Sequence, residues 1–107
     1  MLEQIESIIC REAAFLPKFM PGTPQHSLLV NRIAALNTVR TLLTNGPLPA
    51  REELEFALPR IVSILCKSKK ARDKYEPGSW NFLRTDPLVR LMESAQTLIL
   101  QAMEAYR

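Results

Sequence analysis

The sequence has little of the chemistry on which most small secreted proteins and metalloproteins depend. It has two cysteines, Cys10 and Cys66, which are too few for the disulfide framework of a small secreted domain. Its only histidine, His26, has no further histidine or cysteine ligands at the short spacing that a zinc site requires. The sequence therefore predicts neither a disulfide scaffold nor a bound metal or other cofactor.

Long apolar runs and catalytic motifs are missing as well. The apolar stretch 98–100 is far shorter than the roughly 20 residues that cross a membrane, and no secretory signal opens the chain. There is no phosphate-binding glycine loop, nucleophile elbow or obvious pair of catalytic carboxylates. We therefore expect a cytoplasmic protein that makes no membrane contact and is not an enzyme.

The composition favours an α-helical core. Hydrophobic residues make up 47% of the 107 residues and aromatic residues only 7%, so leucine, isoleucine and alanine must build the core. The length predicts a single helical domain, residues 1–107. The net charge of +3 permits contact with nucleic acid or an anionic surface but does not require it.

The spacing of apolar residues predicts four helices, at about 2–16, 24–44, 50–72 and 87–106. Pro17 ends the first helix because proline cannot donate a backbone hydrogen bond. Thr23 can cap the second helix, and Pro24 suits its first position. Gly46, in the run Asn-Gly-Pro, is expected to take the left-handed turn that ends this helix.

The third and fourth predicted helices each involve a proline. Pro59 falls opposite the apolar stripe of the third helix, which predicts a helix that is kinked but continuous. A break at this residue is the alternative. Pro87 suits the first turn of the fourth helix, with Thr85 or Asp86 as its cap. Residues 79–83 are expected to form a short separate turn.

A repeat appears when each residue is aligned with the residue 56 positions later. The matched pairs include Ile5 with Ile61, Cys10 with Cys66, Lys18 with Lys74, Pro21-Gly22 with Pro77-Gly78, and Thr23 with Ser79. We interpret this as an ancestral duplication of one helical hairpin. The repeat units are about 1–45 and 57–107, with 46–56 as a connection and helix extension. Chance similarity between two amphipathic hairpins is the alternative.

Two such hairpins define an architecture. Each has one apolar face, so the two faces are expected to pack against each other. Short connections favour antiparallel neighbours, which predicts an all-α, antiparallel up-down-up-down four-helix bundle made of two duplicated hairpins. Both Pro-Gly loops would then lie at the same end of the bundle.

Two charged residues fall among apolar neighbours. Glu12 and Arg32 each project to the middle of an apolar face, on helices that are expected to lie side by side. Because an unpaired buried charge is costly, we expect a mutual ion pair. A ligand pocket around these two residues is the alternative interpretation.

Basic residues gather near the two Pro-Gly loops. Helix N-termini after such loops can bind phosphate or carboxylate, and lysines near aromatic residues can hold a nucleic-acid backbone. Cations at the end of a helix also simply complement its dipole. The candidate residues for anion or nucleic-acid binding are Lys18, Lys67, Lys69, Lys70, Arg72 and Lys74.

These features favour a non-enzymatic helical interaction module, which we expect to be bacterial. It would act by self-association or by binding another protein. Apolar residues at the flanks of the helix stripes are typical of such contacts, namely Phe15, Val30, Phe56, Val62, Trp80 and Leu100. The alternative function is binding of a small anion, such as phosphate, or of nucleic acid at the basic loop end.

Overall fold

The computed structural model describes all residues, 1–107, and contains only helices, turns and loops. In chain order the elements are α1 (Leu2–Phe15), a 3₁₀ turn (Leu16–Lys18), α2 (Pro24–Leu43), α3 (Arg51–Asp73), α4 (Trp80–Met103) and a final 3₁₀ turn (Glu104–Tyr106). The predicted all-α class, with four helices packed against one another, is confirmed. None of the four helices has an apolar stretch long enough to cross a lipid bilayer.

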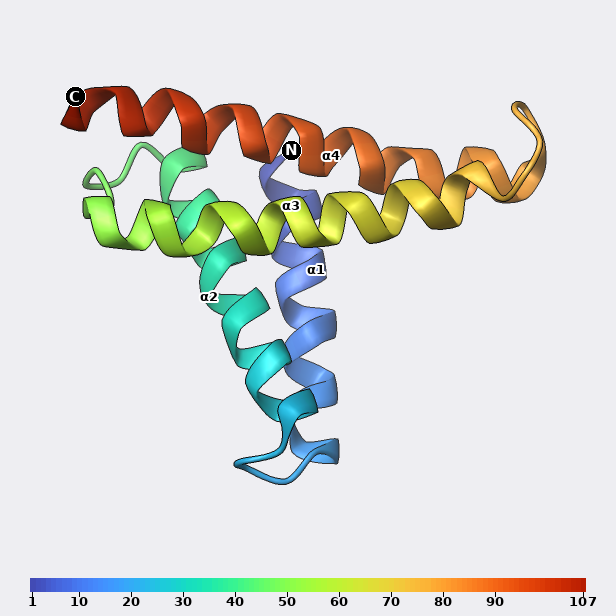
Figure 1. Cartoon of the computed structure of the whole chain (residues 1–107), viewed down its shortest axis with the longest axis horizontal. Helices are drawn as coiled ribbons and strands as arrows, with labels where there is room; N and C mark the ends of the chain where they lie inside the picture. The colour runs from blue at the N-terminus through green and yellow to red at the C-terminus, as the bar shows by residue number, and fades with distance from the viewer.

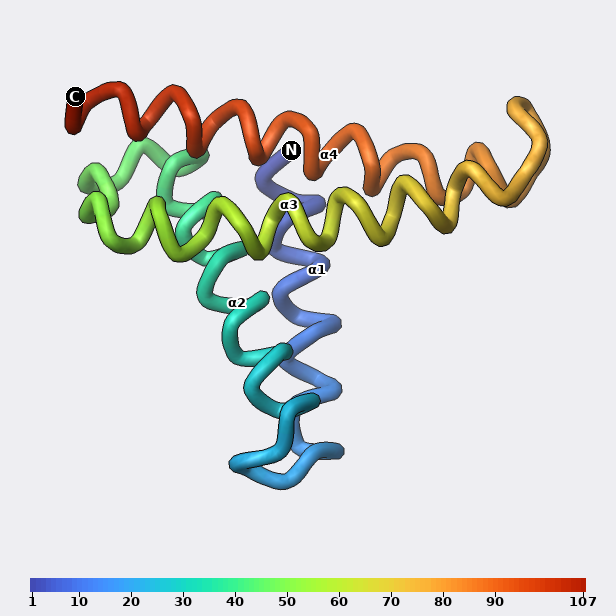
Figure 2. Tube along the Cα trace, in the orientation of Figure 1, coloured from blue at the N-terminus to red at the C-terminus, as the bar shows by residue number.

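The two helical hairpins stand across each other in the shape of a T (Figure 1). We call the hairpin of α1 and α2 the stem, and the hairpin of α3 and α4 the bar. The chain trace in Figure 2 shows the stem joining the middle of the bar, with the loop between α1 and α2 at its free end. The radius of gyration, 14.5 Å, exceeds the roughly 13 Å of a compact domain of this length, as expected for such a shape.

The hydrophobic core lies where the stem meets the bar. The stem contributes residues from the start of α1 and the second half of α2, and the bar contributes residues from the first half of α3 and the second half of α4. The twelve residues of the core are Ile5, Ile8, Ala35, Leu36, Val39, Leu54, Ala57, Ile61, Leu91, Met92, Ala95 and Ile99. The far half of each hairpin therefore projects beyond the core.

This crossing places the two Pro-Gly loops apart, whereas the sequence predicted them at one end. The loop 19–23 lies at the free end of the stem, and the loop 74–79 lies at one end of the bar (Figure 1). Only the near half of the stem is covered by the bar, so the apolar face of α2 is exposed at Leu28 and buried at Leu36. A single shared loop end is therefore absent, and any site expected there must be sought elsewhere.

The two Pro-Gly loops nevertheless have matching local geometry. Gly22 has a φ of +89° and Gly78 a φ of +84°, a region that glycine enters without a Cβ clash. The following residues, Thr23 and Ser79, each cap a helix, and each side-chain oxygen accepts a hydrogen bond of 3.3 Å from the backbone N–H three residues later. The ancestral duplication itself stays a prediction.

The two prolines inside the bar, Pro59 and Pro87, test the helix boundaries that were predicted from the sequence. Helix α3 runs through Pro59 without a break, as predicted. Helix α4 begins at Trp80 rather than at Pro87, so the expected separate turn at 79–83 is wrong. Ser79 is the true cap, and the ring of Pro87 lies on an exposed side of the helix, where it removes one hydrogen bond without disturbing the core.

The end of α2 also differs in one detail. Asn45, not Gly46, has the left-handed conformation, with a φ of 55°. The N–H of Gly46 donates to the carbonyl oxygen of Thr41 at 3.2 Å, which closes the helix in a Schellman-type motif. Asparagine tolerates this conformation better than most residues, so the Asn-Gly pair still ends the helix.

Candidate functional site

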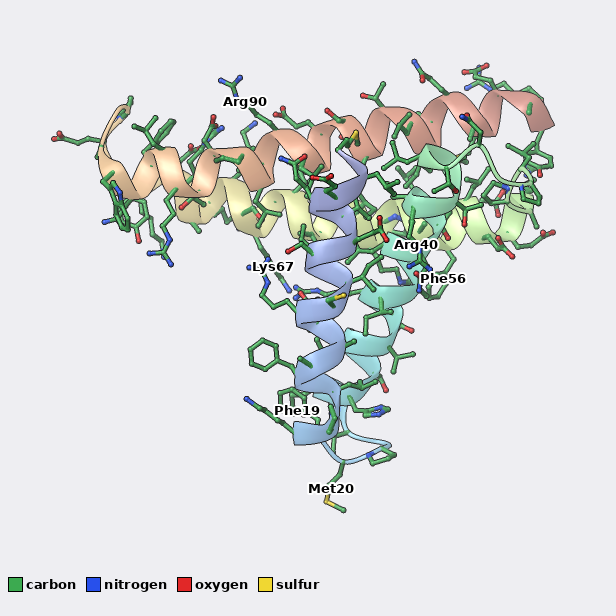
Figure 3. The ribbon with its side chains drawn as sticks, turned by 180° about the vertical axis from the view of Figure 1, so that it is seen from behind. Phe19, Met20, Arg40, Phe56, Lys67 and Arg90 are labelled. Carbon is green, nitrogen blue, oxygen red and sulfur yellow. The ribbon has the colours of Figure 1, made fainter.

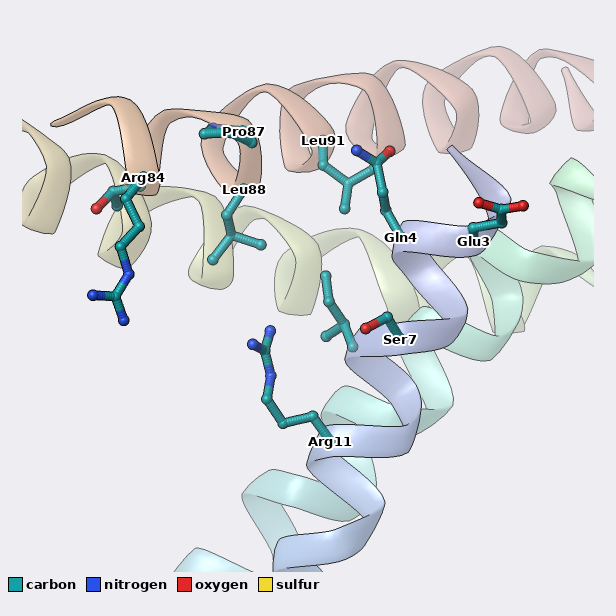
Figure 4. Close-up of a pocket in the computed structure, with 10 residues that line it drawn as sticks. Glu3, Gln4, Ser7, Arg11, Arg84, Pro87, Leu88 and Leu91 are labelled. Carbon is teal, nitrogen blue, oxygen red and sulfur yellow. The ribbon is translucent and has the colours of Figure 1, made fainter. Parts of the chain in front are cut away.

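A cleft of about 520 Å³ lies in the angle between α1 and the first half of α4 (Figure 4). We call it the basic cleft. Its apolar lining comes from one residue of the stem and two of the bar, and its polar lining includes a hydroxyl and two guanidinium groups. The residues that define it are Ser7, Ile8, Arg11, Arg84, Leu88 and Leu91.

Two arginines face each other across the basic cleft. Figure 4 shows the guanidinium groups of Arg11, from α1, and Arg84, from α4, extending into the space between the helices. Neither arginine makes an ion pair within the chain. Their donors are therefore available to a carboxylate or phosphate, for which the planar guanidinium is well suited.

An exposed aromatic ring extends each wall of the basic cleft. Phe15 lies four residues after Arg11 on α1, and Trp80 lies four residues before Arg84 on α4, so helical spacing places each ring on the same face as its arginine. Trp80 is 71% exposed and Phe15 is 44% exposed. The ring of Phe15 has Lys18 Nζ 4.7 Å from its centre, and the guanidinium of Arg84 lies 5.3 Å from the centre of the Trp80 ring.

The lysines singled out from the sequence are exposed, but the fold divides them. Lys67, Lys69, Lys70 and Lys74 lie in the last part of α3 and just after it, and none makes an ion pair. Figure 3 shows Lys67 on the α1 side of the stem. Lys18 ends the 3₁₀ turn Leu16–Lys18, and this turn lies at the free end of the stem, away from the end of α3 (Figure 1). The predicted single basic end is therefore two separate regions.

The sixth predicted residue, Arg72, is held by carboxylates. Its Nη1 lies 2.7 Å from Oδ1 of Asp86 and its Nε lies 3.0 Å from Oδ1 of Asp73, while Arg90 Nε binds the other oxygen of Asp86 at 2.8 Å. The hydrogen bond from Arg72 is the main reason why the pKa of Asp86 lies below its ordinary value, and the same bond raises the pKa of Arg72. Arg72 thus joins α3 to α4 and is not a free cation.

This ion pair predicts a pH-dependent stability. Because the pKa of Asp86 is lower in the folded chain than its ordinary 3.8, the charged carboxylate stabilises the fold above pH 3.8 and loses that effect as the pH falls through the lowered value. We expect Asp86→Asn to lower the Tm at pH 7 and to make a much smaller difference at strongly acid pH. Thermal unfolding followed by circular dichroism checks both values.

The matched control for this prediction is Asp73→Asn. Asp73 binds the same arginine, but its side chain is 53% exposed whereas that of Asp86 is 16% exposed. Exposed ion pairs contribute little, so Asp73→Asn should leave the Tm nearly unchanged at both pH values. Equal losses for the two variants would contradict the assigned role of Asp86.

The ion pair expected between Glu12 and Arg32 is not formed. Both residues are half-buried, and no ion pair joins them to each other or to any other residue. The bar does not cover this part of the stem, so each charge keeps contact with water and needs no partner. Neither residue lines the basic cleft.

The residues with metal-binding or redox chemistry are dispersed. Cys10 and Cys66 are both exposed and unbridged. His26 lies in the first turn of α2, where its backbone N–H donates to the Thr23 side chain. No group of three or more histidine, cysteine, aspartate or glutamate residues converges as a metal site would require.

A cleft on the other side of the stem is lined by carboxylates. A second cleft, of about 480 Å³, lies between α2 and the start of α3 and is lined by Glu52, Glu53 and Phe56 among others. Figure 3 shows Phe56 and Arg40 on this side, across the stem from Lys67. The two clefts therefore differ in charge, since arginines line the basic cleft and glutamates line the second one.

Sequence reasoning missed Arg11 and Arg84 as site residues. Helical spacing in the sequence predicts that Arg11 lies beside Ser7 on one helix and that Arg84 lies beside Leu88 on another. It does not predict that these two helix faces meet. Only the crossing of the hairpins brings them together.

No known protein family, curated protein or solved structure matches this chain.

Proposed function

We propose that this chain is a non-enzymatic helical protein-interaction module that binds a partner protein or a second copy of itself. The observation that supports this most strongly is the exposed apolar and aromatic surface along the two walls of the angle between stem and bar. Phe15 and Trp80 lie outside the basic cleft, one helical turn beyond Arg11 and Arg84 on the same two helices. Aromatic residues and arginine are the residue types most enriched at the centres of protein interfaces.

The flanks of the helices give further support. Five of the six apolar flank residues identified from the sequence are exposed, and only Val62 is half-buried. The five exposed residues are Phe15, Trp80, Val30, Phe56 and Leu100. Single exposed apolar residues are ordinary, but two aromatic rings flanking one cleft are typical of a contact surface.

Sedimentation equilibrium over a wide concentration range tests the self-association form of this proposal. If a second copy binds in the angle, the double variant Phe15→Glu with Trp80→Glu should weaken the association constant by at least about tenfold, because it places charge in an apolar contact. Leu100→Glu is the matched control, since Leu100 is exposed near the other end of α4, outside the angle between α1 and the first half of α4. A strict monomer at millimolar concentration would leave only binding of another protein.

One observation favours a second candidate function, binding of nucleic acid or phosphate at the end of the bar. Four exposed lysines without carboxylate partners lie there, close in the sequence to Tyr75 and Trp80, whose rings are exposed. Backbone phosphates and stacked bases are the groups that such a surface would contact.

Fluorescence anisotropy with labelled single-stranded and duplex oligonucleotides tests this second candidate. Binding should weaken steeply with salt, because each neutralised phosphate releases counterions, and Lys69→Glu with Lys70→Glu should weaken it further. Affinity that does not change with salt, or no measurable binding, would rule it out.

A further inference from the structure

We propose that the basic cleft binds an acidic amphipathic helix of a partner protein, an inference that rests on the proposed interaction function and names the chemistry of the partner. The inference is based on the two unpaired arginines, Arg11 and Arg84, and on the apolar floor between them. In such recognition an apolar helix face enters a groove, and its flanking charges pair with the rim.

The shape of the surface suits a helix. The walls belong to two helices that cross at the core, and the floor consists of Ile8, Leu88 and Leu91. Helical spacing continues the walls outward to Phe15 and Trp80, so the surface extends beyond the 520 Å³ of the cleft itself. An α-helix with its side chains is about 10–12 Å wide, and its residues at i, i+3 or i+4 and i+7 would cover such a floor.

The positive charge of Arg11 and Arg84 at the edges of the basic cleft favours a partner with acidic residues. Arg11 and Arg84 lie on opposite walls and neither has a carboxylate partner, so acidic residues on both flanks of a bound helix would each meet a guanidinium. Lys67 adds positive charge on the same side of the T. Glu3 is the only acidic residue in the lining.

A second copy of this chain is a poor occupant. Its densest acidic segment is Glu52, Glu53 and Glu55 on α3, but Leu54 and Ala57 of that turn are fully buried in the chain's own core. The exposed ring of Phe56 is already in contact with the Arg60 guanidinium, 3.8 Å from its centre. A second copy therefore has no acidic helix with a free apolar face. Nucleic acid is disfavoured as well, because the floor between the two arginines is aliphatic and the exposed rings of Phe15 and Trp80 lie outside the cleft.

Fluorescence anisotropy with designed peptides and the full chain tests the proposal. The probe is a fluorescein-labelled helical peptide of about 18 residues, with leucines at the spacing of one helix face and glutamates on both flanks. One matched peptide replaces every glutamate by lysine, and another has the acidic composition scrambled so that no apolar face forms. The acidic amphipathic peptide should bind at least about tenfold more tightly than either control.

Variants of the chain then locate the binding site. Arg11→Glu combined with Arg84→Glu should weaken binding of the acidic peptide by about tenfold or more, because two attractive contacts become repulsive. Arg40→Glu is the matched control, since Arg40 is exposed, unpaired and on the other side of the stem, and it should change the affinity by less than about twofold. Circular dichroism should show all variants folded, because none of these arginines is buried or paired.

Several outcomes would overturn the proposal. These are no binding of the acidic peptide, equal binding of the lysine peptide, equal sensitivity to Arg40→Glu, or oligonucleotide binding that the Arg11 and Arg84 variants abolish while the peptide does not bind. If the peptide fails but the chain self-associates through Phe15 and Trp80, the interaction function stands and only the acidic-helix partner is lost. If both fail, self-association and the acidic-helix partner are both lost, and the proposed function is left only with a partner of another chemistry.

Discussion

Replacing Leu36 with alanine should lower the free energy of unfolding by about 3 kcal/mol, whereas Leu28→Ala should lower it by less than about 1 kcal/mol. The two leucines lie about two turns apart on the apolar face of α2. Leu36 is fully buried in the core, and Leu28 is 44% exposed on the free half of the stem. Truncating Leu36 removes apolar contacts on all sides and leaves a cavity, while truncating Leu28 removes a side chain that already faces water and leaves no enclosed cavity.

Chemical denaturation followed by circular dichroism measures both values, with the intact helix signal of each variant as the control for folding. A loss of about 3 kcal/mol is a large share of the roughly 5–15 kcal/mol that stabilises a domain of this size. The contrast between the variants is the sharper test. In a bundle whose hairpins lie along each other, both leucines would be buried, and equal losses would contradict the T arrangement.

The helices themselves could be predicted from the sequence because the apolar spacing is regular. Three of the four predicted helices agree with the structure to within about two residues at each end, including the passage of α3 through Pro59. The start of α4 could not be placed because Pro87, preceded by two capping residues, is a typical helix start. The repeat was a better guide to the start of α4 than Pro87, because it pairs Ser79 with Thr23, and Thr23 caps α2.

The arrangement of the hairpins could not be predicted from the same pattern. An apolar face on each hairpin requires that the two faces meet, but it does not fix how the hairpins cross. The pattern on α2 continues through Leu28 as strongly as through Leu36, although only the second is buried. The choice between an aligned and a crossed packing depends on how the side chains of four helices interlock at one place.

The candidate site depends on the crossing of the two hairpins, so it could not be predicted from the sequence either. Contiguous lysines such as Lys69 and Lys70 are visible in the sequence, but Arg11 and Arg84 come from different hairpins. They share a cleft only because the stem crosses the bar and because α4 extends back to Trp80. The pairing of Arg72 with Asp86 depends on the same extension, which is why Arg72 was wrongly grouped with the free cations.

Ala57→Leu should destabilise the fold by about 2 kcal/mol, because the crossing is built around small residues. Three of the twelve core residues are fully buried alanines, one each from α2, α3 and α4: Ala35, Ala57 and Ala95. Small side chains let crossing helices approach closely, so a leucine at position 57 must displace its neighbours or push the stem from the bar. Overpacking of this kind forces strained side-chain conformations or backbone shifts.

Ala71→Leu is the matched control, because Ala71 is exposed on the free half of the same helix, and it should change stability by less than about 0.5 kcal/mol. Chemical denaturation again gives the two values. Ala57→Leu should also weaken binding of the acidic peptide, since the walls of the basic cleft are held together by this crossing, whereas Ala71→Leu should not. If both variants are as stable as the unaltered chain, the helices do not approach closely at position 57, and the cleft is not fixed by a tight crossing.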